Sequence, residues 1–525
     1  MTPKVLIADE LSPRALDIFR ERGIEADLRP GMTPDELAAA IADYDGLAVR
    51  SATKVTAKVL AAAPRLKVVG RAGIGVDNID VAAATARGVV VMNTPYGNAI
   101  TTAEHAIALM MALARQLPAA DRSTRAGKWE KSRFMGVELT AKTLGIIGCG
   151  NIGSIVAERG HGLRMKVIAY DPYLSDERAA DLGVEKVELD ALLARADFIT
   201  LHVPLTDATR NIIDAAAIAK MKRGVRIINC ARGGLVVEAD LKAALESGHV
   251  AGAALDVFAV EPARDNPLFA VEDVVATPHL GAATTEAQEN VAVQIAEQIS
   301  DYLLTGAVAN ALNMPSVSAE EAARLKPYMM LAQQLGSFAG QLTHSGLKAV
   351  TLEYEGQVAA LNTRPLTNIA LAALLAPVLD SVNMVNAPVI ARERDIDVTE
   401  VKHDRPGDYQ TLMRVTVTTD RRTRDVAGTL FADAPRVVEI KGIRVEAELG
   451  RHMLYITNED KPGFIGALGS LLGEAGINIA TFHLGRTAPG RDAIALIEID
   501  QPLGAALLGR VRALPHVMQA DELSF

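Results

Sequence analysis

A glycine-rich turn lies within the segment TLGIIGCGNIGSIVAERGHGLRMKVIAYD, residues 143–171. An apolar run predicts a strand before the turn, a helical pattern follows it, and a second apolar run predicts another strand. Gly148 permits a tight turn, Gly150 leaves room for a pyrophosphate, and Gly153 lets helix and strand pack closely. The free N–H groups at the start of the helix favour phosphate oxygens. The segment therefore predicts a dinucleotide site.

An acidic residue, Asp171, ends the second of these strands. A carboxylate at this position can accept hydrogen bonds from the hydroxyls of the adenosine ribose. Pro172 follows it, with no arginine beside it to bind a 2′-phosphate. The sequence thus favours NAD over NADP as the cofactor.

Three polar residues follow later predicted strands of the same region. Arg232 follows the strand in VRIINCA, Glu261 follows LDVFAV, and His279 follows VVAT. In an open parallel sheet, ligands bind beyond the carboxyl ends of the strands. We therefore expect a guanidinium, a carboxylate and an imidazole at one crevice, beside the dinucleotide.

Together these groups suit hydride transfer coupled to proton transfer. His279 can take the proton of a secondary alcohol near neutral pH, and Glu261 can orient the imidazole and stabilise its protonated form. Arg232 can pair with a substrate carboxylate and polarise the developing carbonyl. Taken singly, each residue has a structural alternative: a packed histidine, a turn carboxylate or a surface ion pair.

Length, charge and cysteine content limit the kinds of protein to which this chain can belong. A chain of 525 residues is too long for one core, and its net charge of −10 argues against a nucleic-acid partner. The two cysteines, Cys149 and Cys230, form no disulfide framework, which fits a cytoplasmic location. No apolar stretch reaches membrane-spanning length, and MTPKVLIADE predicts a buried strand and not a signal peptide.

The element pattern predicts an α/β protein with two parallel-sheet lobes, Rossmann-like or flavodoxin-like, followed by two appended modules. Strands and helices alternate up to about residue 98, and a helix is expected at 101–115 before the glycine-rich unit. Further helices are expected at 285–304 and 319–342. Several strands in succession then predict a small α+β domain, and the order βαββαβ from residue 451 is ferredoxin-like.

The polar residues above belong to a set of spaced motifs that resembles the D-isomer-specific 2-hydroxyacid dehydrogenases over residues 1–315. The motifs are GRAGIGVDNID (70–80), GCGNIG (148–153), LHVPLT (201–206), NCARGG (229–234), LDVFAVEP (255–262) and TPHLGA (277–282). The resemblance implies catalytic roles for Arg232, Glu261 and His279. It implies NAD contacts at Asn151, Ile152, Asp171, Val203, Cys230, Ala231, Arg232, Asp256, His279, Leu280, Gly281 and Ala282.

The whole chain resembles the long-type phosphoglycerate dehydrogenases of that family. This implies a split substrate-binding domain (1–98 and 289–315), an NAD-binding domain (99–288), an intervening domain (316–450) and a C-terminal ACT domain (451–525). The implied reaction oxidises 3-phospho-D-glycerate to 3-phosphohydroxypyruvate in L-serine biosynthesis. A homo-oligomer is implied, with dimer and tetramer both open.

A phosphorylated substrate requires cations and donor amides. The expected contacts are Arg50, Ser51, Lys54, Arg71, Gly73, Ile74, Gly75 and, from a neighbouring subunit, Lys131. The alternative for Arg50 and Lys54 is solvated surface charge. Trp129 is either an interface anchor or part of the core.

The tail segment NEDKPGFIGALGSLLGEAGINI (458–479) resembles the ACT signature. By position, Asn458, Asp460 and Asn478 would contact an effector, which in related enzymes is L-serine. The alternative is that this domain only dimerises.

Other functions remain open on this sequence. One is the oxidation or reduction of glyoxylate, hydroxypyruvate or another 2-hydroxy acid, and another is an NAD-sensing binding module without dominant chemistry. His105 lies within a predicted helix and is expected to be packed, while His202 ends a strand near the cofactor; neither is expected to act as a second base.

Overall fold

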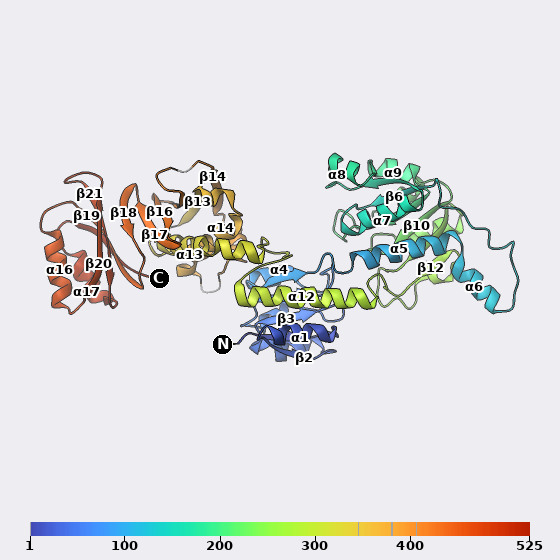
Figure 1. Ribbon diagram of the computed structural model, residues 1–525, viewed down its shortest axis with the longest axis horizontal. Coiled ribbons are helices and arrows are strands. Elements are labelled where there is room, and N and C mark those ends of the chain that lie inside the picture. Colours follow the sequence, from blue (N-terminus) through green and yellow to red (C-terminus); the bar gives the residue numbers. More distant parts are fainter. Residues whose placement is uncertain (1, 345, 380–381, 406) are drawn as a thin grey trace.

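A computed structural model describes residues 2–344, 346–379, 382–405 and 407–525. Four sheets follow one another along an elongated chain (Figure 1). We call the part built on strands β1–β5 together with helix α12 the first lobe, and the part built on β6–β12 the second lobe. No helix in these described ranges is both long and apolar enough to cross a membrane.

The first lobe is a parallel five-stranded sheet in the order β2-β1-β3-β4-β5, the flavodoxin-like order. Apart from the edge strand β2, its strands are short, mostly buried apolar runs, because helices cover both faces. The strands are β1 (Lys4–Ile7), β2 (Glu25–Leu28), β3 (Gly46–Val49), β4 (Val68–Arg71) and β5 (Val90–Asn93). The helices are α1 (Pro13–Glu21), α2 (Pro34–Ala40), α3 (Ala57–Ala61), α4 (Val81–Ala86) and α12 (Thr285–Thr305).

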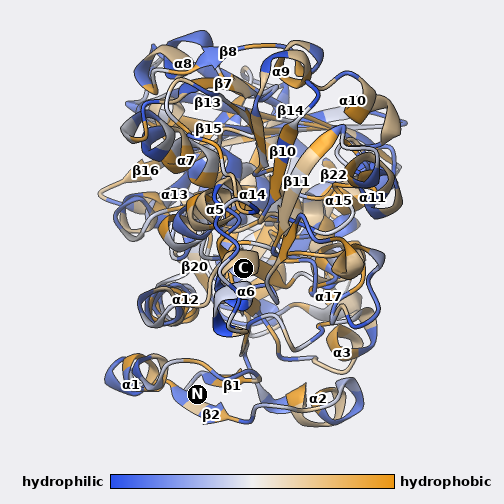
Figure 2. Cartoon of the chain, turned by 90° about the vertical axis from the view of Figure 1, so that its right-hand side faces the viewer, coloured by the Kyte–Doolittle hydropathy of each residue, from blue (hydrophilic) through white to orange (hydrophobic). Residues whose placement is uncertain are grey.

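The second lobe is a parallel seven-stranded sheet in the order β12-β11-β10-β9-β6-β7-β8. The order in which successive strands are added reverses between β9 and β6, as in the dinucleotide-binding fold. Its central strands are strongly hydrophobic (Figure 2). The strands are β6 (Thr143–Ile147), β7 (Lys166–Tyr170), β8 (Glu185–Lys186), β9 (Phe198–Leu201), β10 (Val225–Asn229), β11 (Val250–Leu255) and β12 (Val274–Ala276). The helices are α5 (Ala99–Ala114), α6 (Leu117–Arg125), α7 (Asn151–Gly162), α8 (Asp176–Asp181), α9 (Leu189–Arg195), α10 (Ala215–Ala219) and α11 (Glu238–Glu246).

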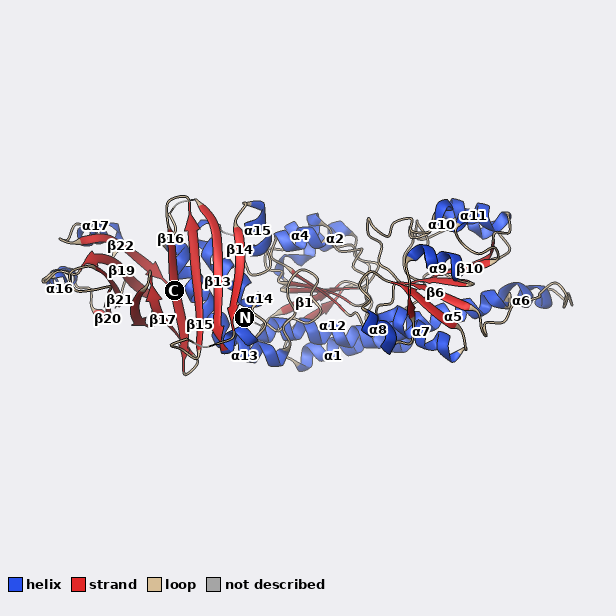
Figure 3. Cartoon of the chain, turned by 90° about the horizontal axis from the view of Figure 1, so that it is seen from above, coloured by secondary structure: helices blue, strands red, loops and turns tan. Residues whose placement is uncertain are grey.

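The third sheet has the order β14-β13-β15-β16-β17-β18, and α13 and α14 cover one of its faces (Figure 3). The sequence pattern missed its edge strand β14, which is mostly exposed and lacks an alternating apolar face. The strands are β13 (Leu347–Gly356), β14 (Asp397–His403), β15 (Thr411–Thr419), β16 (Thr423–Phe431), β17 (Ala434–Ile440) and β18 (Ile443–Ala447). The helices are α13 (Ala319–Gln341), α14 (Arg364–Leu375) and α15 (Ala387–Glu393).

The fourth sheet confirms the predicted βαββαβ order, with strands arranged β20-β21-β19-β22. One face packs on its own two helices, and the other contributes Met453 and Tyr455 to the hydrophobic core of the third sheet. The two C-terminal modules therefore share one continuous core. The elements are β19 (His452–Glu459), α16 (Phe464–Glu474), β20 (Ile479–Arg486), β21 (Asp492–Ile499), α17 (Gly504–Arg512) and β22 (Val517–Ser524).

Candidate active site

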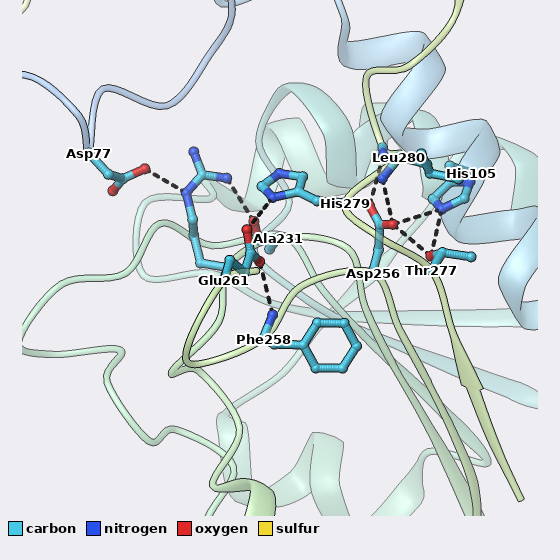
Figure 4. A network of polar contacts seen from close by, with 11 residues as sticks. Asp77, His105, Ala231, Asp256, Phe258, Glu261, Thr277, His279 and Leu280 are labelled. Atoms are coloured by element: carbon cyan, nitrogen blue, oxygen red, sulfur yellow. Dashed lines mark hydrogen bonds and ion pairs between the residues drawn. The ribbon is translucent and has the colours of Figure 1, made fainter. Parts of the chain in front are cut away.

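The catalytic histidine predicted from sequence lies on the turn after β12 and is paired with the predicted glutamate. Nδ1 of His279 lies 2.7 Å from Oε2 of Glu261 (Figure 4). The other oxygen of Glu261 accepts a hydrogen bond of 3.0 Å from the amide of Phe258. The carboxylate is thus fixed at both oxygens, and it fixes the imidazole in turn.

Arg232 reaches the same edge of the sheet from the end of β10. Its Nη1 donates to the carbonyl of Ala231 at 2.7 Å, and its Nε donates to Asp77 of the first lobe at 2.8 Å. A Cβ added to Gly75 would lie 1.5 Å from Nη2 of Arg232, so the guanidinium rests directly on the backbone of the first lobe. Gly233, the next residue, lies against the backbone of Phe258, the residue whose amide binds Glu261. The structure therefore brings Arg232 close to the Glu261–His279 pair, at the boundary between the lobes (Figure 4).

A buried acid holds the turn that carries His279. The carboxylate of Asp256 accepts hydrogen bonds of 2.7 Å from the amides of Leu280 and Gly281 and one of 2.6 Å from Thr277 Oγ1. The amide of His279 donates to the Asp256 carbonyl, and this stabilises the left-handed backbone (φ 57°) of His279. Asp256 was predicted to contact NAD, but the residue has no exposed surface and its carboxylate is used inside the protein.

His105 also contacts this buried acid and the threonine bound to it. Its Nε2 lies 3.3 Å from both Thr277 Oγ1 and Asp256 Oδ1. Burial alone would raise the pKa of Asp256, but the hydrogen bonds from His105, Thr277 and the Leu280 amide lower it below its usual range. His105 is packed, as predicted, but it also supports the site. Helical periodicity does not reveal which strand end a helix residue will face.

His202 directly follows β9, at the strand end where the sequence predicted it. Burial lowers the pKa of His202 to about 4, so the imidazole is neutral. Its Nε2 lies 2.9 Å from Thr200 Oγ1.

The glycine-rich turn has the shape that a pyrophosphate needs. Gly148 has φ 91°, and a Cβ on Gly153 would lie 2.0 Å from the Gly148 carbonyl oxygen. A Cβ on Gly150 would have no atom within 4 Å, so this glycine borders open space at the start of α7. Asp171 accepts hydrogen bonds from the amides of Cys149 and Tyr173, both at 2.9 Å, and a carboxylate has lone pairs left for further donors. These residues fit a bound NAD.

The remaining predicted NAD residues lie at the start of α7 or after strands of the same sheet. Asn151 and Ile152 begin α7, and the side chain of Asn151 donates to the carbonyl of Pro95 at 3.3 Å. The other positions follow β9, β10 or β12 and are partly or wholly buried, apart from Leu280: Val203, Cys230, Ala231, Gly281 and Ala282.

The predicted substrate cations lie on the first lobe. Arg71 ends β4, its guanidinium lies against Gly73, and its buried Nε has no hydrogen-bond partner among the described residues. Burial, together with the nearby Arg232 and Arg50, lowers the pKa of Arg71 to about 10. Three arginines therefore gather at the boundary of the lobes. Ser51 and Lys54 are exposed on the adjoining loop.

The glycine turn of the first lobe, Gly73 to Gly75, was predicted to offer its amides to an anion. This prediction is wrong for the amide of Gly73. The amide of Gly73 donates to Thr94 Oγ1 at 2.7 Å. The side chain of Asn93 holds the turn through the carbonyl of Ile74 at 2.6 Å. Among the described residues, the amides of Ile74 and Gly75 have no acceptor.

Lys131 and Trp129 lie on the segment that follows α6, at the far end of the second lobe (Figure 1). The described part of the chain gives Lys131 no ion pair, and Trp129 is 87% exposed. A core position for Trp129 is therefore wrong. Met135 on the same segment is 75% exposed, so this region presents apolar side chains to its surroundings.

Each predicted effector residue has its own surroundings within the chain. Asp460 pairs with Arg486 at 2.7 Å and accepts from the amide of Gly490, while Asn478 donates to Asp500 at 2.9 Å. Asn458 is buried, and its Oδ1 has no partner.

Comparison with known proteins agrees with this architecture. The D-isomer specific 2-hydroxyacid dehydrogenase NAD-binding domain matches residues 107–281, the D-3-phosphoglycerate dehydrogenase intervening domain matches 324–441, and the ACT domain matches 452–516. Among solved structures, a protein from Thermus thermophilus is 34% identical with a TM-score of 0.55, covering 59% of this chain and 99% of its own. A glyoxylate reductase from Paecilomyes thermophila is 29% identical with a TM-score of 0.56, covering 59% of this chain and 98% of its own.

Full-length relatives share the whole arrangement. D-3-phosphoglycerate dehydrogenase of Archaeoglobus fulgidus is 43% identical over 98% of this chain and 99% of the relative. The Synechocystis protein of that name is 42% identical over 98% and 94%, and that of Bacillus subtilis is 41% identical over 98% of both chains. The chain therefore belongs to the D-3-phosphoglycerate dehydrogenase family of NAD-dependent oxidoreductases.

Proposed function

We propose that this protein oxidises 3-phospho-D-glycerate to 3-phosphohydroxypyruvate, the first step of L-serine biosynthesis. The observation that carries the proposal is the His279–Glu261 pair, which shares one boundary with Arg232 and the arginines of the first lobe. The names of the full-length relatives support the same substrate.

His279 serves as the general base. Because the Glu261 carboxylate can only accept, Nδ1 of His279 carries a proton and Nε2 is left to receive one. Nε2 takes the hydroxyl proton of the substrate, and Glu261 stabilises the imidazolium that forms. When bound, NAD supplies the acceptor for the hydride that leaves the hydroxyl-bearing carbon.

The arginines bind the two anionic ends of the substrate. Arg232 takes the carboxylate and polarises the carbonyl oxygen as it forms. The free amides of Ile74 and Gly75 support the same group, while Arg50 and Arg71 take the phosphate. Their mutual repulsion without substrate favours a multiply charged anion over a simple 2-hydroxy acid.

The second lobe holds the cofactor. The amides at the start of α7 receive the pyrophosphate, and Asp171 receives the ribose hydroxyls. Because the Asp256 carboxylate is enclosed, its part is to keep His279 and Leu280 in place. The four sheets support the division 1–98 with 289–315, 99–288, 316–450 and 451–525, except that α12, which begins at Thr285, belongs as a whole to the first lobe. The unpaired, buried Cys149 and Cys230 are compatible with a cytoplasmic location.

The first experiment measures NADH absorbance with NAD and 3-phosphoglycerate. Turnover is expected to rise at alkaline pH, because the oxidation releases a proton. His279→Ala should lower kcat by about 10²- to 10⁴-fold, the usual contribution of a general base. Undiminished turnover in that variant would refute the assignment of the base.

A substrate panel separates the alternatives. Glyoxylate, hydroxypyruvate and other 2-hydroxy or 2-oxo acids are compared with 3-phosphoglycerate in the wild type and in Arg50→Ala. Only a phosphorylated substrate should lose much affinity in the variant. Tight NADH binding without turnover on any acid would favour an NAD-sensing module instead.

L-serine acts at the ACT domain and inhibits the enzyme in this proposal. Serine binds between paired domains, where its ammonium shares Asp460 with Arg486 and Asn478 contributes its amide. The exposed Trp129 and Met135 support a homo-oligomer, in which Lys131 approaches the neighbouring site. Inhibition weakened by Asn478→Ala is the expected result, and a flat response to serine would leave the domain with an assembly role.

A further inference from the structure

Across the described residues, one ion pair joins the two lobes: Asp77 Oδ2 lies 2.8 Å from Nε of Arg232 (Figure 4). We propose that Asp77 is a positioning residue, which fixes the guanidinium of Arg232 so that Nη2 faces the substrate carboxylate. The proposal rests on the function proposed above for Arg232. Asp77 itself does not touch the reacting atoms.

The donors of Arg232 show how this positioning operates. Nε is held by Asp77 and Nη1 by the carbonyl of Ala231 at 2.7 Å, while no described residue accepts from Nη2. The backbone of Gly75 closes the adjacent side, where a Cβ would meet Nη2 at 1.5 Å. With two nitrogens engaged and one face blocked, the guanidinium plane has a single orientation.

The loop that carries Asp77 is rigid because the next residue ties it to the loop of Arg50. The side chain of Asn78 donates to the carbonyls of Arg50 and Thr53, both at 2.7 Å. Asp77 therefore links the position of Arg232, on the second lobe, to the loop that we expect to bind phosphate. The distance between the two anion sites is set by this link.

The ion pair is too exposed to serve stability alone. The side chain of Asp77 is 64% exposed and that of Arg232 is 28% exposed. Ion pairs in such surroundings contribute about 0–1 kcal/mol to the free energy of unfolding. Asp77 also lies close enough to Arg71 to offset the repulsion between Arg71 and Arg232. These observations favour a role in the site.

Asp77→Asn is the direct test, with Asp80→Asn as the matched control. Asp80 lies on the same loop, but its carboxylate caps α4 through the amide of Ala83 at 2.9 Å. We expect kcat/KM for the hydroxy acid to fall by about 10- to 100-fold in Asp77→Asn, as when a reacting group is misplaced by about 1 Å. The Kd for NADH, from fluorescence, and the Tm should not change. The control should match wild type in all three.

A double-mutant cycle with Arg232→Lys separates this proposal from the function on which it rests. If Asp77 acts through Arg232, adding Asp77→Asn to Arg232→Lys should cause no further loss. Three results would each overturn the positioning role. They are additive losses of activity in the double variant, wild-type activity in Asp77→Asn when Arg232→Lys is impaired, and a lower KM in Asp77→Asn. Full activity in Arg232→Lys would instead refute the proposed function of Arg232.

Discussion

Nε2 of His105, on helix α5, lies 3.3 Å from the buried carboxylate of Asp256, and that carboxylate holds the turn on which His279 lies. A helix packed on the sheet thus supports a catalytic turn at the edge of the sheet. The support is electrostatic as well as steric, because hydrogen bonds to a buried charge are stronger than those between neutral groups. Changes at Asp256 should therefore affect the site without any contact with substrate.

The first prediction concerns the pH dependence of this support. The pKa of Asp256 lies below its ordinary value, so its contribution to stability is present above about pH 4 and is lost as pH falls through the lowered pKa. Asp256→Asn should reduce the free energy of unfolding by about 2 kcal/mol near neutral pH. The difference in Tm from wild type should shrink in acid. A difference that stays constant from pH 7 to pH 2.5 would contradict this account.

The second prediction compares two glycines of the nucleotide turn. Gly150→Ala places a methyl group in open space, so the Tm should hold while the Kd for NADH rises by about tenfold or more, because a pyrophosphate must approach there. Gly153→Ala would bring Cβ to 2.0 Å from the Gly148 carbonyl, so stability should fall by about 1–3 kcal/mol. Thermal unfolding and NADH fluorescence separate the two effects. Unchanged NADH affinity in Gly150→Ala would mean that the pyrophosphate lies elsewhere.

The third prediction concerns Glu261→Gln. The amide of Phe258 needs an oxygen acceptor, so the new NH₂ group must face Nδ1 of His279. The imidazole proton then moves to Nε2, the atom that should receive the substrate proton, and kcat for oxidation should fall by about 10²-fold or more. Glu238→Gln is the control, since Glu238 accepts from the amide of Ala259 on the same loop without touching His279. Equal losses in both variants would point to loop disorder and not to tautomer control.

The fourth prediction concerns a half-buried lysine, Lys441, between the C-terminal modules. Nζ of Lys441 lies 5.7 Å from the ring centre of Tyr455, and burial, followed by Arg424 and Arg422, lowers the pKa of Lys441 to about 8. Below about pH 8 the charged amine therefore lowers the free energy of unfolding. This loss of stability disappears between about pH 8 and the ordinary pKa of lysine.

Lys441→Met should accordingly raise the Tm most near pH 7, and the gain should diminish as pH rises to about 10. Lys348→Met, at an exposed position on β13, serves as the control and should show no such trend. If the increase in Tm did not vary with pH, packing alone would explain the effect of Lys441→Met.

The local pattern along the chain determined most elements and the chemistry of the site. Apolar runs, turn glycines and the order of strands and helices predicted the two parallel sheets and the βαββαβ tail, because these features depend on neighbouring residues. The rule that ligands lie at the carboxyl ends of strands predicted that Arg232, Glu261 and His279 would meet, which their positions confirm.

Only the tertiary structure decided which polar groups are free and which are used within the protein. Sequence spacing does not show that Asp256 is enclosed, that the amide of Gly73 is taken by Thr94, or that Asp77 reaches Arg232 across the lobes. Each of these contacts joins segments 21 or more residues apart, and the Asp77–Arg232 pair spans 155 residues. Such contacts follow from how sheets and lobes pack, and a periodic pattern carries no information about that packing.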